Sequence, residues 1–176
     1  MRTEIPFNKA KMMASGVGAF LFVVLGCLLI INTINNPDQI IPLVVKVGGS
    51  ISIVFFGGVL IVIIIKLLDK KPAMVIDENG ILDNASGVSA GLITWKDITH
   101  TRIEQVMNNR FLIIYTTNPE KYLQKVSRTK AWLMKRNMAM YGSPITIPAS
   151  TIKYNLNELQ NLILIEMEKH SDRGIA

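Results

Sequence analysis

The sequence predicts a membrane protein with an N-terminal hairpin of two transmembrane helices and a C-terminal α+β domain. Two long apolar stretches lie within the first 68 residues, and most of the 19 Lys and Arg and 13 Asp and Glu residues fall outside them. After these stretches, short apolar runs alternate with turn residues, which is typical of strands. The predicted parts are a cytoplasmic tail over 1–11, spans over 12–34 and 43–68, an outer loop over 35–42, and a soluble domain over 72–176.

The first span, residues 12–34, is a run of about 23 residues without a charge. As a helix it reaches about 34 Å, which is enough to cross the hydrocarbon core. A cleaved signal peptide is the alternative, but the run is too long and no small-x-small cleavage site follows it. In the second span, Lys46 lies close to the outer end, where we expect its stem to snorkel toward the headgroups.

The charges that flank the spans predict their orientation. The loop at 35–42 contains no Lys or Arg. The positive-inside rule therefore places both termini in the cytoplasm. The basic residues on that side are Arg2, Lys9, Lys11, Lys66, Lys70 and Lys71.

Small residues recur at four-residue spacing in both spans. They are Ala10, Ala14 and Gly18 in the first span, and Gly48 and Ser52 in the second. Such faces let helix backbones approach closely. The pattern fits packing of the hairpin on itself, and it also fits dimerisation through the same faces.

The soluble domain is expected to be an antiparallel sheet, or a partly open barrel, closed by a C-terminal helix. An Asn-Gly turn at 77–80 indicates a hairpin, and 84–91 is small and polar enough for a loop. A helix is predicted from about 157, because leucines and an isoleucine recur on one face there. The predicted strands cover 73–76, 81–82, 91–95, 98–106, 110–116 and 145–147.

One basic helix is predicted inside this domain, over residues 119–141. Asn118, Pro119 and Glu120 form a start signal for it. Basic and apolar residues on a tethered helix suit anionic headgroups or a protein partner; the alternative is a solvated helix whose apolar face completes the core. Nucleic acid is not expected, since the rest of the domain is nearly balanced in charge. The candidate contact residues are Lys121, Lys125, Arg128, Lys130, Trp132, Lys135 and Arg136.

The remaining polar residues carry no pattern of catalysis or metal binding. His100 and His170 have no Cys, His or acidic partner at metal-ligand spacing. Asp77, Glu78 and Asp83 flank a turn and are expected to be solvated. The sequence therefore predicts no catalytic residue, no metal and no cofactor.

The segment 91–98 resembles part of the bacterial pleckstrin-homology-like domains, which carry an Ile-x-Trp-x-Asp/Glu-Ile pattern. Ile93, Trp95, Asp97 and Ile98 match it, and Trp95 is expected to anchor the core. The whole arrangement resembles a group of bacterial two-span membrane proteins, which implies the inner membrane. The basic helix between strands departs from the simplest pleckstrin-like pattern. The resemblance implies a role in envelope stress or in immunity to bacteriocins, and no reaction.

The function expected from these observations is a non-catalytic interaction module anchored at the inner leaflet. The second hypothesis is that the chain is a subunit of an oligomeric membrane complex in which the transmembrane hairpin is the working part, and a homo-oligomer is one form of it. A membrane enzyme of envelope metabolism is the third, and no residue pattern supports it.

Overall fold

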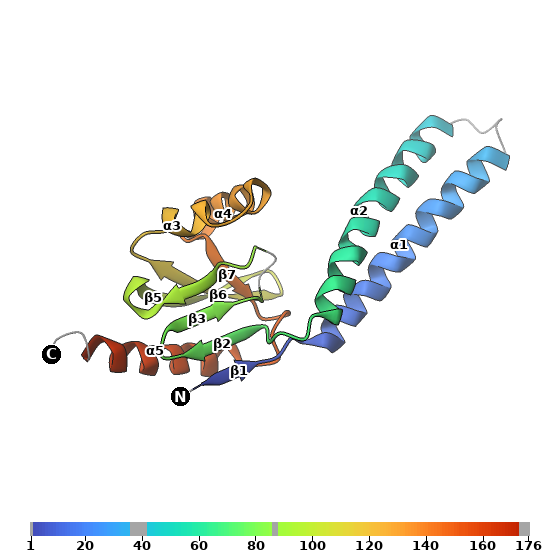
Figure 1. Cartoon of the computed structure of the whole chain (residues 1–176). Helices are drawn as coiled ribbons and strands as arrows, with labels where there is room; N and C mark the ends of the chain where they lie inside the picture. Colours follow the sequence, from blue (N-terminus) through green and yellow to red (C-terminus); the bar gives the residue numbers. More distant parts are fainter. Residues whose placement is uncertain (1, 36–41, 86–87, 173–176) are drawn as a thin grey trace. The chain divides into compact units, whose positions relative to one another are not determined.

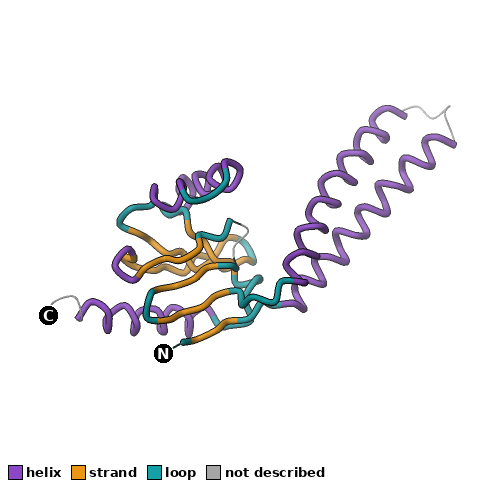
Figure 2. The backbone as a smooth tube through the Cα atoms, in the orientation of Figure 1, coloured by secondary structure: helices purple, strands orange, loops and turns teal. Residues whose placement is uncertain are grey.

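The computed structural model describes residues 2–35, 42–85 and 88–172, and these form two compact units. The hairpin unit is Lys9–Lys70, and the soluble unit combines Met1–Asn8 with Lys71–Ala176. Figures 1 and 2 show two long helices in the hairpin unit and all the strands in the soluble unit. The described part of the soluble unit is α+β, with two antiparallel sheets and no closed barrel.

Helices α1 (Lys9–Asn35) and α2 (Pro42–Leu68) are both long and apolar enough to cross a membrane. Only 17% of the most apolar stretch of α1 is buried, and 0% of that of α2. A core helix of a soluble protein would be mostly buried, so this exposure favours lipid as the surroundings of both helices. The predicted outer loop lies largely at 36–41, outside the described residues.

Helices α1 and α2 approach each other closely at Gly26 and Gly49. A Cβ built on Gly26 would lie 2.9 Å from the Gly49 carbonyl oxygen, and one built on Gly49 would lie 3.0 Å from that of Gly26. About one turn farther from the connection between the two helices, the hydroxyl of Ser52 donates to the Phe22 carbonyl at 3.1 Å. Of the predicted packing residues, only Ser52 therefore takes part in this contact.

The prediction that Ala14, Gly18 and Gly48 pack the hairpin on itself is wrong. Ala14 and Gly48 are exposed, and a Cβ on Gly18 or Gly48 would meet nothing within 4 Å. The four-residue spacing identified faces rich in small residues, but the mutual rotation of the two helices decides which face is in contact.

Replacing Gly26 with leucine is expected to destabilise the hairpin by about 2 kcal/mol, because overpacking forces the two backbones apart. The measurement is the SDS fraction at the midpoint of unfolding, followed by the helicity of the full chain. Gly18→Leu is the matched control, since that position is open. Equal midpoints for the two variants would contradict the Gly26–Gly49 contact.

The first sheet has the strand order β1-β2-β3-β4, and β1 was not predicted from the sequence. Ile5 of β1 pairs with Met74 of β2, so part of the predicted tail over 1–11 belongs to the sheet. A cleaved signal peptide would remove this strand, which favours a retained first helix. The strands are β1 (Thr3–Ile5), β2 (Met74–Asp77), β3 (Gly80–Asp83) and β4 (Gly91–Thr94).

The second sheet has the strand order β5-β6-β7 and follows β4 through the short 3-10 helix η1. Leu112 and Ile114 of β6 are fully buried, and they pair with Ile147 and Ile145 of β7. The elements are η1 (Trp95–Asp97), β5 (Ile98–Val106), β6 (Asn109–Thr116), α3 (Glu120–Gln124), α4 (Arg128–Tyr141), β7 (Ile145–Pro148) and α5 (Leu156–Asp172).

Helix α5 contributes one apolar face to the core, as its periodicity predicts. Leu156, Leu159 and Ile163 are at most 3% exposed. The helix lies against β5, where the Gln160 side chain donates to the Thr101 carbonyl at 3.0 Å. Burying three such side chains stabilises the domain by several kcal/mol.

One end of the soluble unit is where its chain leaves for α1, and we call it the exit end. Asn8, the last residue before α1, donates its backbone N–H to the Thr151 carbonyl at 2.8 Å. Just upstream, Ala149 donates to the Arg110 carbonyl at 2.8 Å. The turn between β5 and β6, which precedes Arg110, therefore also lies at the exit end.

Candidate interaction surface on helices α3 and α4

The basic segment 119–141 forms two helices, so the prediction of one continuous helix is wrong. Ser127 has an extended backbone, with φ −61° and ψ 157°, and α4 starts directly after it. This conformation is that of an N-cap, a position where serine is favoured. Before the break, α3 buries Tyr122 and Leu123, whereas Met134 is the buried residue of α4.

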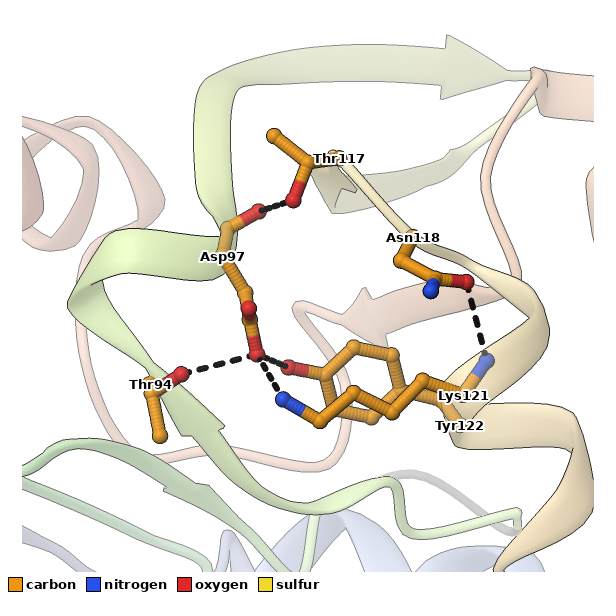
Figure 3. A network of polar contacts seen from close by, with 6 residues as sticks. All are labelled: Thr94, Asp97, Thr117, Asn118, Lys121 and Tyr122. Atoms are coloured by element: carbon orange, nitrogen blue, oxygen red, sulfur yellow. Dashed lines mark hydrogen bonds and ion pairs between the residues drawn. The ribbon is translucent and has the colours of Figure 1, made fainter.

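A buried carboxylate anchors α3 to the end of the first sheet (Figure 3). Asp97 of η1 accepts hydrogen bonds from Thr94 at 2.7 Å, from the Lys121 ammonium at 2.5 Å and from the Tyr122 hydroxyl at 2.8 Å. Its backbone carbonyl accepts the N–H of Thr117 at 2.8 Å. Four hydrogen bonds to Asp97 thus link η1 with the end of β4, with the residue after β6 and with α3.

The local electrostatics of this cluster favour a charged aspartate. Burial by itself raises the pKa of Asp97, but hydrogen bonds from Lys121, Thr94 and Tyr122 and the charge of Lys121 outweigh it and lower that pKa to about 2. Burial, together with the hydrogen bond to Asp97, raises the pKa of Tyr122 above 10.0. Both groups therefore stay in one protonation state near neutral pH, which suits a structural link.

Helix α4 packs on the second sheet through its inner side. Met134 is fully buried, and the Asn137 amide donates to the Thr146 hydroxyl at 3.1 Å. The carbonyl of Tyr141 accepts the Tyr115 hydroxyl at 2.8 Å. Thr146 pairs with Ile113 of β6, so the last turns of α4 run along β6 from the level of Ile113 to that of Tyr115.

The outer side of α4 carries both exposed apolar residues and cations. Trp132 is 56% exposed, Leu133 41% and Met140 63%. Arg136 lies over the Trp132 ring, with its Cζ 5.3 Å from the ring centroid. Arg128, Trp132, Arg136 and Met140 follow one another at four-residue spacing and so share a face. The solvated-helix alternative expected the apolar residues of 119–141 in the core; Tyr122, Leu123 and Met134 are buried there, whereas the apolar residues of the outer side of α4 are exposed.

The predicted basic residues differ in how free they are to meet a partner. Lys121 is held by Asp97, and the ammonium of Lys125 lies 5.7 Å from the centroid of the Tyr122 ring. Lys130 is half-buried. Arg128, Lys135 and Arg136 are exposed and share the outer side with Trp132. The contact surface therefore concentrates on α4 rather than on α3.

The structure contradicts the prediction made for Asp83 and confirms the one made for Trp95. Asp83 is buried, with 1% exposure, so the prediction that it is solvated is wrong. Its carboxylate accepts the N–H groups of Ala85 at 2.9 Å and Ala90 at 3.0 Å, and so holds these two residues close to the end of β3. Trp95 is 7% exposed and donates to the Asp77 carbonyl at 2.8 Å, which confirms its place in the core.

Both histidines of the described ranges stack on aromatic rings. His100 stacks on Tyr115 with ring centroids 4.1 Å apart, and His170 stacks on Trp95 at 5.4 Å. Within 2–35, 42–85 and 88–172, no three His, Cys, Asp or Glu side chains gather where they could hold a metal ion.

The link between Asp97 and α3 was not predicted from the sequence. Lys121 and Tyr122 lie 24 and 25 residues beyond Asp97, so no local pattern joins them. Comparison of the chain with protein-family models, curated proteins and solved structures gives no match.

Proposed function

We propose that this chain is a non-catalytic, membrane-anchored interaction module, and that the outer side of α4 docks on anionic lipid headgroups of the inner leaflet. The observation that carries the proposal is the sharing of one exposed face by Trp132, Leu133 and Met140 with Arg128, Lys135 and Arg136. An interfacial helix needs this combination, because its apolar side chains enter the headgroup boundary while its cations meet the phosphates.

The magnitudes favour a reversible contact. Each Lys or Arg near an anionic surface contributes about 1 kcal/mol, so Arg128, Lys135 and Arg136 together contribute about 3 kcal/mol. Covalent attachment to the same membrane raises the local lipid concentration, so even this modest energy suffices for docking.

Strand pairing supports a two-span topology. Because β1 and β2 lie in one sheet, the residues before α1 and after α2 must be on the same side of any membrane that the hairpin crosses. The basic residues at that side, and the absence of Lys and Arg in 35–42, favour the cytoplasm. In this proposal the protein resides in a bacterial inner membrane.

The finer fold and the biological role belong to the same proposal. Two antiparallel sheets with a C-terminal helix are compatible with a pleckstrin-like domain opened on one side, with α3 and α4 inserted before β7. Protection of the envelope, or immunity to a membrane-active toxin, is the role we propose for such a module.

The test uses the full chain, because a fragment over 72–176 would lack β1. We expect Trp132 to be shielded from acrylamide in nanodiscs that contain phosphatidylglycerol, and to be open to it in pure phosphatidylcholine or at high salt. The buried Trp95 contributes little to quenching. Converting Arg128 and Arg136 to glutamate should shift the docking equilibrium by at least roughly 30-fold.

Lys96→Glu is the matched control, since Lys96 is exposed and belongs to η1 rather than to α4. It should leave the shielding of Trp132 unchanged. Equal quenching in neutral and anionic nanodiscs would contradict docking on headgroups and would direct attention to an acidic protein partner for the same face.

A second candidate function is a homo-oligomer formed through the hairpin. Ala14 and Gly48 stay exposed, and Gly18 and Gly48 have open space where a Cβ would stand. A second copy could approach closely along these residues. Crosslinking in native membranes tests it, and a result of monomers alone would exclude it.

A further inference from the structure

The turn between β5 and β6 exposes two apolar side chains at its tip. Val106 pairs with Asn109, so Met107 and Asn108 form a two-residue hairpin turn. Met107 is 88% exposed and Val106 41%. An apolar side chain at a two-residue turn, where polar residues and glycine are usual, indicates a surface that is covered in the working protein.

The backbone of Met107 is strained as well. Its φ is +54°, a conformation in which glycine is preferred at this turn position. Methionine is unbranched but still pays a steric penalty there, and its side chain gains no packing in return, since it remains in solvent. A residue that is both strained and exposed suggests a function for that side chain.

The position of the tip points to what covers it. Arg110, three residues beyond Met107, accepts the N–H of Ala149, and Thr151 accepts the N–H of Asn8. Asn8 is the last residue before α1 begins. The tip therefore lies at the exit end of the soluble unit, the end that the chain leaves to enter the membrane.

The charge beside the tip fits a lipid surface as what covers it. Residues 105–110 include no acid, and Arg110 is exposed there. The Arg110 guanidinium donates to the Asn157 side chain at 2.8 Å, which fixes it beside the turn. An apolar tip with a cation beside it matches the boundary between headgroups and acyl chains.

We infer that the β5–β6 turn dips Val106 and Met107 into the leaflet that receives α1, and so seats the soluble unit on the bilayer through a contact separate from α4. The inference rests on the proposed membrane location of α1 and α2, but it does not depend on docking by α4.

The experiment places a nitroxide spin label at Met107→Cys in the full chain, in nanodiscs with phosphatidylglycerol. Cys27, the single cysteine of the chain, is first replaced by serine. The control is Asn79→Cys, at the two-residue turn between β2 and β3. Met74, at the start of β2, pairs with Ile5 near the exit end, so the turn at the other end of β2 lies away from it. Collisions with oxygen, which concentrates in lipid, and with a nickel chelate, which stays in water, are measured at both sites.

We expect the ratio of oxygen to nickel collisions at 107 to exceed that at 79 by about threefold or more, as for a side chain within the headgroup boundary. Equal ratios would overturn the inference, because the tip would then be in water. Shielding from both reagents would also overturn it, since a protein surface rather than lipid would cover the tip.

Failure of this inference is distinguishable from failure of the proposed function. If Trp132 is shielded by anionic lipid while the label at 107 meets water, only the tip contact is wrong. Met107→Gly, which removes the side chain and suits the positive φ, should fold normally. A spin label at Val106→Cys is then compared with Met107 present and with Met107→Gly. We expect the glycine variant to lose at least half of the excess of oxygen over nickel collisions. An unchanged excess would contradict insertion through Met107.

Discussion

Replacing Asp97 with alanine is expected to lower the free energy of unfolding of the soluble unit by about 3 kcal/mol. The substitution leaves the fully buried Tyr122 hydroxyl without its acceptor and removes the partner of Lys121. Lys121 keeps a side-chain exposure of 35%, so water compensates part of its loss, and the estimate is at the lower end for a broken buried pair. The measurement is the urea midpoint, followed by Trp95 fluorescence in a Trp132→Phe background.

Two controls separate the parts of this effect. Asp97→Asn keeps an acceptor for Tyr122 and Thr94 but removes the charge, so its effect should be smaller than that of alanine. Tyr122→Phe removes a single hydroxyl donor and should cost about 1 kcal/mol. A urea midpoint unchanged by Asp97→Ala would contradict the role of this carboxylate in holding α3.

The same carboxylate predicts how stability depends on pH. The pKa of Asp97 is about 2 in the folded protein against an ordinary value of 3.8, so the unfolded chain binds the proton first as the pH falls. Its contribution of about 2 kcal/mol is present above pH 4 and is lost between about pH 4 and pH 2. Asp97→Asn should flatten this part of the profile. A residual slope is expected from Glu166, whose pKa is lowered by the hydrogen bond from Lys169.

Gly80→Ala is expected to destabilise the soluble unit at least as much as Asp97→Ala, lowering its free energy of unfolding by about 3 kcal/mol or more. Gly80 has φ +144°, and a Cβ there would lie only 2.0 Å from the carbonyl oxygen of Ile93 in β4. The obstacle is backbone of the neighbouring strand, so relief requires β3 and β4 to separate. Ile81 and Ile93, both fully buried, would then lose their packing.

Gly91→Ala provides the matched comparison. Gly91 also has a positive φ, +71°, but a Cβ there would meet nothing within 4 Å. Its cost should be limited to backbone strain, about 1 kcal/mol. Urea midpoints of the two variants measure the difference, and equal losses would show that steric overlap with β4 is not what requires glycine at 80.

Local patterns predicted much of the soluble unit because its strands are bounded by strong turn signals. The Asn79-Gly80 turn and the run from Ile98 to Val106 were assigned from residue type and alternation alone. By contrast, β1 has three residues and its partner, β2, lies beyond both long helices. Pairing over such a separation leaves no local trace, so a strand of this kind reads as a tail.

The sequence predicts which segment carries the interaction surface, but not how its helices and side chains are arranged. The concentration of cations and Trp132 between 119 and 141 is visible in the sequence. The break at Ser127 is not, because it follows from the need of Tyr122 to reach Asp97 while Met134 packs on the other sheet. Only this arrangement decides that the apolar and basic residues of α4 face outward together.

The pairing of β1 with β2 also determines the order in which the protein can be made. A ribosome synthesises Thr3–Ile5 first, but their partners, Met74–Ile76, emerge only after both long helices. In the membrane location that we propose for the hairpin, β1 stays unpaired while the two helices insert, and the first sheet forms only afterwards. A chain whose second helix failed to insert would leave β1 and β2 on opposite sides of the bilayer, where they cannot pair. Insertion of both helices would thus be a precondition for the formation of the first sheet.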